Sequence, residues 1–580
     1  MSTVASGTSA ERRHDLDALR ATAMLLGIAL HAAIPYAPFF PWAIQDSRTS
    51  QSFSLLFASI HGFRMPLFFL ISGFFTAMIW KHKGLATMLR QRTLRILLPC
   101  LLATVTIIPL MSWITRQVAM ETPRAATVQT DSAAPAPAPT SLLIEAIRQN
   151  SPETLQKFLT EKPAAINQPD TELQVRPLAW AALHGNIKAV QLLLDAGADP
   201  NGRNGDGSTA LHGAVFTGRP EVLRLLLEHG ADPESKNLQG EVPAQAAAAD
   251  LGSTVFFWSI LQLPPENPEH IALGREQCVA LLPPAPPATP ATPQDLLSSI
   301  RTHYTNLLTA PFWLVQISRG TNTHSFHLML SPVFDHLWFL WFLCWMIGGF
   351  AIVTKPLSWM ARNVIPSAPR LARLLTVSPL KLIFLLPTTA TMALMGLFGP
   401  SFGPDTSLGL LPQPHVIIYY SLFFAFGCLY FIADDHDGRT GRLWWVCLPL
   451  SLFLLLPLSL GLGESRLAGA AVQSAYAWLM TFGSLGVFRR FLRRPNATIR
   501  WLSDASYWLY LTHLPLLFAI QAPLRSLEFP AWMKFGFSCL TCTGLLLIVY
   551  QYAVRYTWLG TLLNGPRRRA TDVGRPVSAP

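Results

Sequence analysis

The chain has 580 residues, of which 51% are hydrophobic and only 13% are charged. Because a soluble globular domain carries about a quarter charged residues, this deficit excludes an ordinary soluble protein and indicates a chain that folds largely in lipid. The formal net charge of +11 would suit a nucleic-acid-binding protein. The basic residues lie between apolar runs, however, as the topology signals of membrane proteins do, so we expect no nucleic-acid partner.

Apolar stretches with the length of a membrane-spanning helix, about 20 residues, recur along the chain. They predict an all-α fold, a polytopic membrane helix bundle of about ten spans. The first stretch follows a short basic leader and is long enough to remain as an anchor, so we expect no cleavable signal peptide. The predicted spans are residues 18–36, 55–80, 94–113, 337–354, 379–399, 415–433, 443–462, 467–488, 501–522 and 533–554.

Lys and Arg residues mark every second loop between these spans. The alternate short loops hold little more than Arg48, Arg466 and Arg525. Under the positive-inside rule, this bias predicts that both termini are cytoplasmic. The basic segments are the leader, the loops at 81–95, 355–381, 439–442 and 489–500, and the tail at 567–569.

The loop after the third span contains a repeat with a period of 33 residues. GNIKAVQLLLDAGADPNGRNGDG is followed by GRPEVLRLLLEHGADPESKNLQG, so that Gly185 matches Gly218 and Gly197 matches Gly230. The segment TALHGA at 209–214 is similar to the TPLHxA start of an ankyrin repeat. A weaker copy precedes these two (SLLIEAIRQNSPETLQKFL) and a decayed copy follows (EVPAQAAAADLG), as expected of the capping units of an α-helical solenoid.

Pro- and Ala-rich segments, PAPAPTS and PPAPPATPATP, flank the repeats and have the composition of linkers. Because three predicted spans precede the repeats, we expect the ankyrin module on the side of the membrane opposite to the termini. The predicted division is a first membrane part at 1–115, ankyrin repeats at 141–262, a Pro-rich linker at 263–295, a second membrane part of about seven spans at 300–560, and a basic cytoplasmic tail at 561–580.

Arg20 and His31 are candidate catalytic residues in the first span. They are eleven positions apart, and eleven steps of 100° make about three turns, so both lie on one helix face, roughly 16 Å apart along the axis. Ionisable groups at membrane depth are costly and usually face an interior cavity. The alternative is an arginine that snorkels to the interface and a histidine bonded within the bundle.

The second span contributes His61, Arg64 and Ser72 as candidate substrate-binding residues. His61 and Arg64 are one turn apart, and the direction of the span places them near the end of the first span that carries His31. The alternatives are a polar anchor at the membrane surface for this pair and close helix packing for Ser72 and the adjacent Gly73.

Four further polar residues complete the candidate substrate-binding set. His336 opens the fourth span, where a simple loop-end histidine is the alternative. Ser506, Tyr510 and His513 follow the i, i+4, i+7 spacing of one helix stripe in the ninth span. Such a stripe lines a cavity or forms a packed hydrogen-bond network, and both interpretations stay open.

Metal binding is not predicted. The chain has seven Cys, most of them in or beside apolar segments, where a thiol behaves as a small hydrophobe. Cys539 and Cys542 form a CxxC inside a predicted span, without the second pair that a zinc site needs. We find no phosphate-binding glycine loop, no HExxH and no GxSxG after a strand.

Several segments, in this order, resemble the acyltransferase-3 family of integral-membrane acyltransferases: LDALRATAMLLGIALH, FFLISGFF, RTLRILLP, HLWFL and SYWLYLTHLPL. Within that family, HAAIPY, IHGFRMPLFFLISGFF, HLWFLWFL, FAFGCLYF and YWLYLTHLPL are similar to the glucan biosynthesis protein C group, the succinyltransferases of periplasmic glucans. The ankyrin insert departs from the usual pattern of the family.

The resemblance implies a multi-pass protein of the bacterial inner membrane. The side opposite to the termini, where the span count places the ankyrin module, is then the periplasm. The resemblance also implies transfer of an acyl group, in this group succinyl, from cytoplasmic acyl-CoA to a hydroxyl of a periplasmic glucan or another cell-envelope glycan. Acyl-CoA is then a donor substrate, and no resident cofactor is expected. By analogy, His31 is the general base and Arg20 binds or polarises the donor.

Two other classes of function fit the same residues. In a transporter or channel, the polar stripes would line a permeation path. In a membrane-anchored scaffold, the ankyrin repeats would bind a protein partner and the bundle would serve only as an anchor. Consumption of acyl-CoA that depends on His31 distinguishes the enzyme from both.

Overall fold

The chain divides into two compact units in a computed structural model. A membrane unit contains Met1–Arg124, Pro311–Gly396 and Ser401–Pro580, and a second unit contains Ala125–Ala310 and Leu397–Pro400. The structure describes residues 13–38, 44–46, 48–121, 139–170, 174–237, 240–248, 263, 268–283, 293–319, 322–363, 368–397, 402–462 and 466–565. Most of the two Pro- and Ala-rich segments, PAPAPTS and PPAPPATPATP, lies outside these residues.

The first part of the membrane unit consists of α1 (His14–Ala33), α2 (Gln51–Lys83), α3 (Leu85–Arg92) and α4 (Leu98–Glu121). Ser50 caps α2 by accepting a hydrogen bond from the Ser52 amide, and Gly84 ends the helix with a φ of 78°. That φ lies in the left-handed region that favours glycine. A π-helical turn at Thr93–Leu97 joins α3 to α4 and alters the direction of the side chains there.

The second part adds helices that pack against the first. They are α14 (Trp338–Asn363), α15 (Ala368–Thr376), α16 (Leu385–Ala393), α17 (Pro414–Ala433), α18 (Trp444–Leu450), α19 (Leu456–Gly461), α20 (Arg466–Phe491), α21 (Ala497–Leu524), α22 (Ala531–Val549) and α23 (Trp558–Asn564). A two-stranded antiparallel hairpin, β1 (Leu314–Arg319) and β2 (Asn322–His327), precedes α14. The sequence did not indicate this hairpin. Apart from it, the predicted all-α fold is confirmed.

Seven helical segments among the described residues are long and apolar enough to cross a membrane. An eighth is added if Pro369–Thr376 and Pro379–Ala393, which meet at a bend of 73°, form one span. The predicted spans 467–488 and 501–522 are occupied by α20 and α21, which are 26 and 28 residues long but are not among the seven. Their buried polar side chains lower the hydropathy, and neighbouring helices cover much of their surface.

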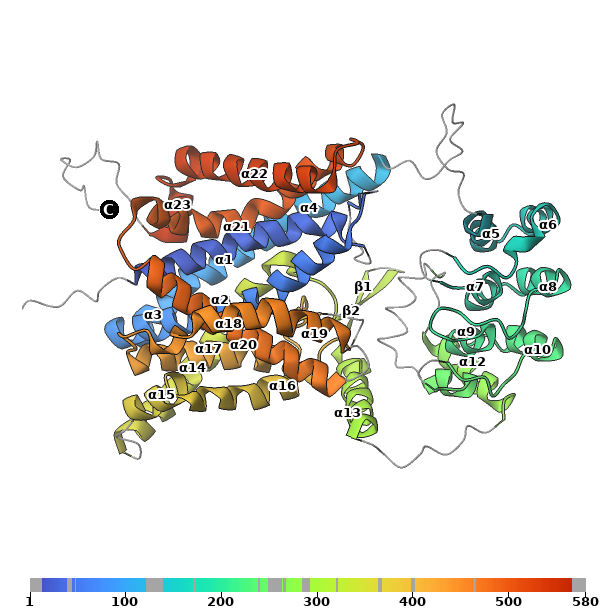
Figure 1. Cartoon of the computed structure of the whole chain (residues 1–580), viewed down its shortest axis with the longest axis horizontal. Helices are drawn as coiled ribbons and strands as arrows, with labels where there is room; N and C mark the ends of the chain where they lie inside the picture. Colours follow the sequence, from blue (N-terminus) through green and yellow to red (C-terminus); the bar gives the residue numbers. More distant parts are fainter. Residues whose placement is uncertain are drawn as a thin grey trace, which may run out of the picture. The chain divides into compact units, whose positions relative to one another are not determined.

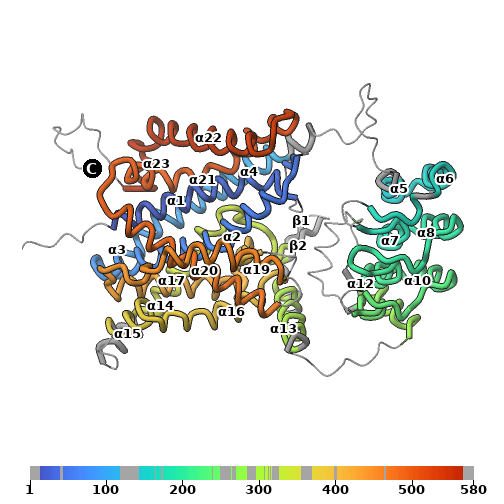
Figure 2. The backbone as a smooth tube through the Cα atoms, viewed as in Figure 1, coloured from blue at the N-terminus to red at the C-terminus, as the bar shows by residue number. Residues whose placement is uncertain are grey.

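α1 lies at the centre of the membrane unit, where it packs on α2, α20, α21 and α22. Figures 1 and 2 show α1 and α21, which come from opposite ends of the chain, lying side by side. The segment after α1 is tied to α22 by a buried ion pair of 2.7 Å between Asp46 and Lys534. This packing fixes the faces of α1 and α21 that carry the candidate residues.

Glycines bring α2 and α17 into direct backbone contact. A Cβ added at Gly73 would lie 2.0 Å from the Phe424 carbonyl oxygen, and one added at Gly427 would lie 1.9 Å from the Leu70 carbonyl oxygen. Neither position has room for a side chain. Gly73 therefore serves close helix packing, as one of the two sequence interpretations of this position held.

The second unit stacks short helices in pairs (Figure 1). They are α5 (Pro139–Arg148), α6 (Pro152–Glu161), α7 (Pro177–His184), α8 (Ile187–Asp195), α9 (Ala210–Phe216) and α10 (Pro220–Glu228). The amides of Asp199 and Asp232 are bonded to the side-chain oxygens of Asn167 and Asn201, at 2.9 and 2.7 Å. Equivalent bonds thus link successive repeats, as a solenoid requires.

Part of the predicted linker at 263–295 is folded, so the prediction was wrong there. Residues 268–280 form α12 (Pro268–Ala280), which packs on α9 and α10. Cys278 is fully buried in the core of the repeats, and a Cβ added at Gly274 would lie 2.2 Å from the Gly218 carbonyl oxygen. The Pro-rich surroundings masked this helix in the sequence. A further helix, α13 (Pro293–Leu308), follows it.

Candidate functional site

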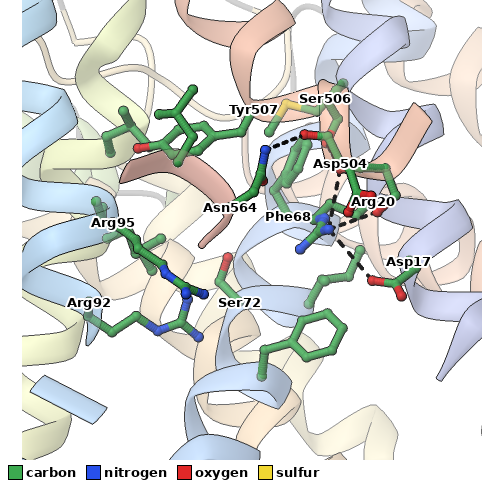
Figure 3. Close-up of a pocket in the computed structure, with 18 of the residues that line it drawn as sticks. Asp17, Arg20, Phe68, Ser72, Arg92, Arg95, Asp504, Ser506, Tyr507 and Asn564 are labelled. Atoms are coloured by element: carbon green, nitrogen blue, oxygen red, sulfur yellow. Dashed lines mark hydrogen bonds and ion pairs between the residues drawn. The ribbon is translucent and has the colours of Figure 1, made fainter. Parts of the chain in front are cut away.

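A cavity of about 510 Å³ opens inside the membrane unit at the level of Arg20 (Figure 3). Its wall comes from α1, α2, α3, the π-helical turn, α14, α21 and α23. Three residues of the predicted site, Arg20, Ser72 and Ser506, line this cavity. The other polar lining residues are Arg13, Asp17, Gln91, Arg92, Arg95, Ser503, Asp504, Tyr507 and Asn564.

Arg20 is held at the cavity wall by α21 and by its own helix. Its Nη2 donates to the Ser503 hydroxyl at 2.7 Å and lies 3.6 Å from the Asp17 carboxylate, and the guanidinium faces the Phe75 ring. The side chain remains about a third exposed, at 35%. The guanidinium is therefore fixed in position and still open to the cavity, as expected for a group that binds an anion.

Two further arginines reach the same cavity, Arg92 from the last residue of α3 and Arg95 from the π-helical turn. Figure 3 shows their guanidinium groups and that of Arg20 pointing toward a common space beside Ser72. Arg92 donates to the Thr76 hydroxyl at 3.0 Å, and its Nε has no hydrogen-bond partner within the described residues. We call Arg20, Arg92 and Arg95 the arginine end of the site.

Sequence reasoning missed Arg92 and Arg95, which had been interpreted only as topology signals. The available signal was the spacing of the two arginines at the start of an apolar span, in the RTLRILLP segment. With Arg13 and Arg20 they bring four cationic groups to a wall that holds two carboxylates, Asp17 and Asp504. The lining thus has an excess of positive charge suited to a phosphate-bearing ligand.

Deeper in the membrane unit, the cavity wall becomes apolar. Met24, Phe68, Ile71, Phe339 and Leu343 line this part. Met24 is one turn beyond Arg20 on the same face of α1, in the direction of His31. The cavity therefore passes from a cationic entrance to an apolar wall that is directed along α1.

His31 meets His513 of α21 near the other end of α1. The Nδ1 of His31 lies 2.9 Å from the Nε2 of His513, and the two rings stack with centroids 5.0 Å apart. The ring of His336 stands at 89° to that of His513, with centroids 5.7 Å apart. We call His31, His336 and His513 the histidine cluster. None of the three lines the described cavity.

Pro515 explains how His336 is oriented. A proline has no amide hydrogen, so the carbonyl four residues earlier in the helix, that of Leu511, loses its usual donor. The Nε2 of His336 lies 3.3 Å from this carbonyl and takes the place of the missing amide. Tyr510 holds the same residue by donating its hydroxyl to the His336 carbonyl. The Nδ1 of His336 is buried and has no hydrogen-bond partner in the described part of the chain.

The side chain of Arg64, from α2, lies against α1 between the arginine end and the histidine cluster. A Cβ added at Gly27 would lie 2.1 Å from the Arg64 Nη1, so the guanidinium rests against the bare backbone of α1. Gly27 is seven residues after Arg20 and four before His31, which places it on their common face. The Nε of Arg64 is buried without a partner among the described residues.

His61 and Ser506, two of the predicted substrate-binding residues, contact other residues of the membrane unit. The ring of His61 stacks on Phe57 with centroids 5.0 Å apart, and a Cβ added at Gly403 would lie 2.9 Å from it. Ser506 donates to the Ser503 carbonyl at 2.7 Å. The stripe predicted from Ser506, Tyr510 and His513 therefore divides between the cavity and the histidine cluster.

A second cavity of about 810 Å³ adjoins the first and shares Arg13 and Met78 with it. Its wall comes from the same end of α1 and from the ends of α2, α17 and α20 nearest to it. Besides Arg13, its basic residues are His14, Lys81, His82, Arg373, His436, Arg489 and Arg493. Within the described residues, no group of three or more His, Cys, Asp or Glu side chains is placed to hold a metal ion.

Comparisons with known proteins bear on both units. The sequence model of a family described as an acyltransferase domain matches residues 13–124 and 294–551, and that of ankyrin repeats, in three copies, matches residues 143–237. Among solved structures, the ankyrin repeat domain of Bcl-3, a member of the IkappaB protein family, shares 35% identity, with a TM-score of 0.17, and covers 18% of this chain and 45% of that chain.

Curated relatives match a shorter stretch. Glucans biosynthesis protein C of Escherichia coli strain K12 is 36% identical over 103 residues, which are 18% of this chain and 26% of that protein. The protein of the same name from Escherichia coli O1:K1 / APEC gives the same identity and coverage. The match thus spans about a quarter of the length of these relatives.

Proposed function

The chain belongs to the acyltransferase-3 family of membrane acyltransferases, and on that premise we propose that it moves an acyl group from cytoplasmic acyl-CoA to a hydroxyl of a periplasmic glucan in the bacterial inner membrane. One observation carries this proposal. A single face of α1 joins a cationic cavity at Arg20 to a histidine pair at His31. An anionic donor needs cationic groups to bind its phosphates, and a hydroxyl acceptor needs a base to take its proton.

The arginine end suits the donor. The phosphates of acyl-CoA would bind the guanidinium groups of Arg20, Arg92 and Arg95, which make charge-assisted hydrogen bonds in a fixed planar geometry. The adjoining basic cavity provides room for a large anionic head group. The apolar wall at Phe68 and Phe339 then receives the uncharged arm that ends in the thioester.

The two ends of α1 lie at a distance that an extended donor is able to bridge. Arg20 and His31 are roughly 16 Å apart along the helix axis, at 1.5 Å per residue. A donor held by its phosphates at the arginine end thus directs its thioester toward the histidine cluster. The groups that bind the donor are therefore separate from the groups that act on its acyl carbon.

In the reaction, His31 accepts the proton of an acceptor hydroxyl as the oxygen attacks the thioester carbonyl. The new C–O bond forms, the C–S bond breaks, and the CoA thiolate takes up the proton that His31 had accepted. The products are the O-acyl ester and free CoA thiol, so atoms and charge balance. A positioned histidine contributes roughly 10²- to 10⁴-fold in such a step.

Two other residues suit the substrates near His31. The buried, unpartnered Nδ1 of His336 is able to accept a hydrogen bond from a sugar hydroxyl. Arg64 retains donor capacity on its Nε and suits the terminal carboxylate of a succinyl group. Succinyl as the acyl group follows from the resemblance to the glucan biosynthesis protein C group. The glucan acceptor is supported by the names of the similar proteins from Escherichia coli.

The charge distribution supports the proposed sides of the membrane. The basic residues of the second cavity lie at the arginine end and come from the ends of several helices and from residues just beyond those ends. Under the positive-inside rule that end faces the cytoplasm, where acyl-CoA is found, with both termini on the same side. The ankyrin module follows three spans and would then lie in the periplasm, where we propose that it binds a protein partner.

The test uses purified full-length protein in lipid nanodiscs, with succinyl-CoA and linear glucan. We expect release of free CoA thiol and a mass increase of the glucan, both dependent on His31. His303→Ala changes an exposed histidine of α13 and serves as the matched control. Absence of both products from well-folded wild-type protein, with acetyl-CoA as well, would contradict the proposal.

A further inference from the structure

The hydrogen bonds of His513 determine which of its ring nitrogens carries the proton. Its Nδ1 lies 2.8 Å from the Tyr510 carbonyl and 3.2 Å from the Leu509 carbonyl. A carbonyl oxygen only accepts hydrogen bonds, so the Nδ1 of His513 must donate. In the neutral ring, the lone pair then lies on Nε2.

The same argument continues to His31. The Nε2 of His513 lies 2.9 Å from the Nδ1 of His31. Because that Nε2 carries a lone pair, the Nδ1 of His31 is the donor in this bond. The neutral ring of His31 therefore has its own lone pair on Nε2, the nitrogen that points away from His513. Two backbone carbonyls of α21 thus set the tautomer of a histidine on α1.

We propose that His513 is a positioning residue, which fixes the tautomer of His31 and makes Nε2 the atom that accepts the hydroxyl proton. This inference rests on the proposed function and assigns His513 a role other than substrate binding. After proton transfer, His31 carries a hydrogen on both nitrogens, and its Nδ1 still donates to His513. The proton on Nε2 then passes to the departing thiolate, and both rings return to their starting state.

The surroundings explain why a histidine holds this position. In a catalytic triad, a carboxylate orients the histidine, but an ionised carboxylate at membrane depth is costly. A neutral imidazole accepts the same hydrogen bond without a buried charge. The ring of His513 is only 2% exposed and is packed edge-on against His336, whose own orientation is set by the Leu511 carbonyl.

Two substitutions separate the hydrogen bond from mere packing. In His513→Gln, the amide oxygen is able to accept from His31 and the amide NH₂ to donate to the α21 carbonyls. In His513→Leu, the volume is similar but the acceptor is lost. We expect His513→Leu to lower kcat by roughly 10²- to 10⁴-fold, the range for loss of general base catalysis, with little change in KM for either substrate. His513→Gln should retain kcat within about tenfold.

Equal activity of the Leu and Gln variants, or a Leu variant with wild-type kcat, would overturn the proposal. A rise in the acceptor KM without a fall in kcat would instead assign His513 to substrate binding. A direct measurement covers the case in which a variant does not fold. Nitrogen-15 NMR of histidine-labelled wild-type protein, with His31 assigned from its loss in His31→Gln, should show a protonated Nδ1. A protonated Nε2 on His31 would refute this role of His513. The proposed acyltransferase function would stand, because it requires only that the activity is observed.

Discussion

The two ends of α1 recognise different chemistry, and their surroundings differ accordingly. At the arginine end, the three arginines, together with Arg13 and two carboxylates, line an open cavity. In the histidine cluster, imidazole rings are packed against one another and hydrogen-bonded to backbone carbonyls. An anion is bound by the summed attraction of several cations, whereas a proton is accepted by the lone pair of one correctly oriented nitrogen atom. Removing one group should therefore cost more at the histidine cluster than at the arginine end.

The largest effect is expected from His31→Ala. The variant should lose transfer by at least about 10²- to 10⁴-fold, because alanine cannot accept the proton that the proposed mechanism assigns to His31. Its affinity for acyl-CoA, measured by isothermal titration calorimetry, should stay close to the wild-type value because the arginine end is intact. Near-normal transfer by an abundant, inserted variant would remove His31 from the mechanism, and a loss of donor affinity would contradict the separation of the two ends.

A smaller effect is expected from Arg92→Gln or Arg95→Gln. Each removes one charged hydrogen-bonding partner, worth about 1.5–3 kcal/mol, so the KM for acyl-CoA should rise about 10- to 100-fold. The value of kcat at saturating donor should change much less. Arg494→Gln, at an exposed arginine outside both cavities, is the matched control. A fall in kcat with an unchanged donor KM would place these arginines in the chemical step and break the comparison.

Between the two ends, Gly27→Ala tests Arg64. The new Cβ would lie 2.1 Å from the Arg64 Nη1, so the guanidinium must move, while the flexible side chain allows the fold to persist. If Arg64 binds the carboxylate of a succinyl donor, the preference for succinyl-CoA over acetyl-CoA should fall by about tenfold, roughly one charge-assisted hydrogen bond. Gly536→Ala is the control, because nothing lies within 4 Å of a Cβ there. An equal loss of activity with succinyl-CoA and with acetyl-CoA would show that Arg64 does not bind the carboxylate.

The sequence predicted those features of the site that follow from spacing along one helix. The eleven-residue interval between Arg20 and His31 was enough to place both on one face of α1. The partners across helices were not accessible in this way. His513 lies 482 residues from His31, and no periodicity in either segment indicates that the rings meet.

Other features were hidden because one sequence pattern served two purposes. Arg92 and Arg95 have the position of topology signals, yet both line the cavity from the junction of α3 and the π-helical turn. The segment at 268–280 lies between Pro-rich runs and was interpreted as linker, although Cys278 joins the ankyrin core. Gly27 was indistinguishable from any other small residue of a membrane helix until the position of Arg64 was known.

The last prediction changes no residue of the site and should leave activity unaltered. It tests whether the two ends of α1 face opposite sides of the membrane. Three spans precede the ankyrin repeats, so alkaline phosphatase inserted near Gly240 should be active in cells, and green fluorescent protein at the same place should be dark. At Gly84, the residue between α2 and α3 close to the basic side chains of the arginine end, the two reporters should give the opposite pattern.

Equal behaviour of the reporters at Gly84 and Gly240 would place both loops on one side and require an even number of crossings between them. The helical segment Leu85–Thr115, which contains most of α4, is the only candidate span between the two sites among the described residues. Such a result would mean that α4 does not cross. It would place the ankyrin module on the same side of the membrane as the arginine end and contradict the proposed periplasmic position of that module. Opposite patterns at the two sites would support the periplasmic position independently of any activity measurement.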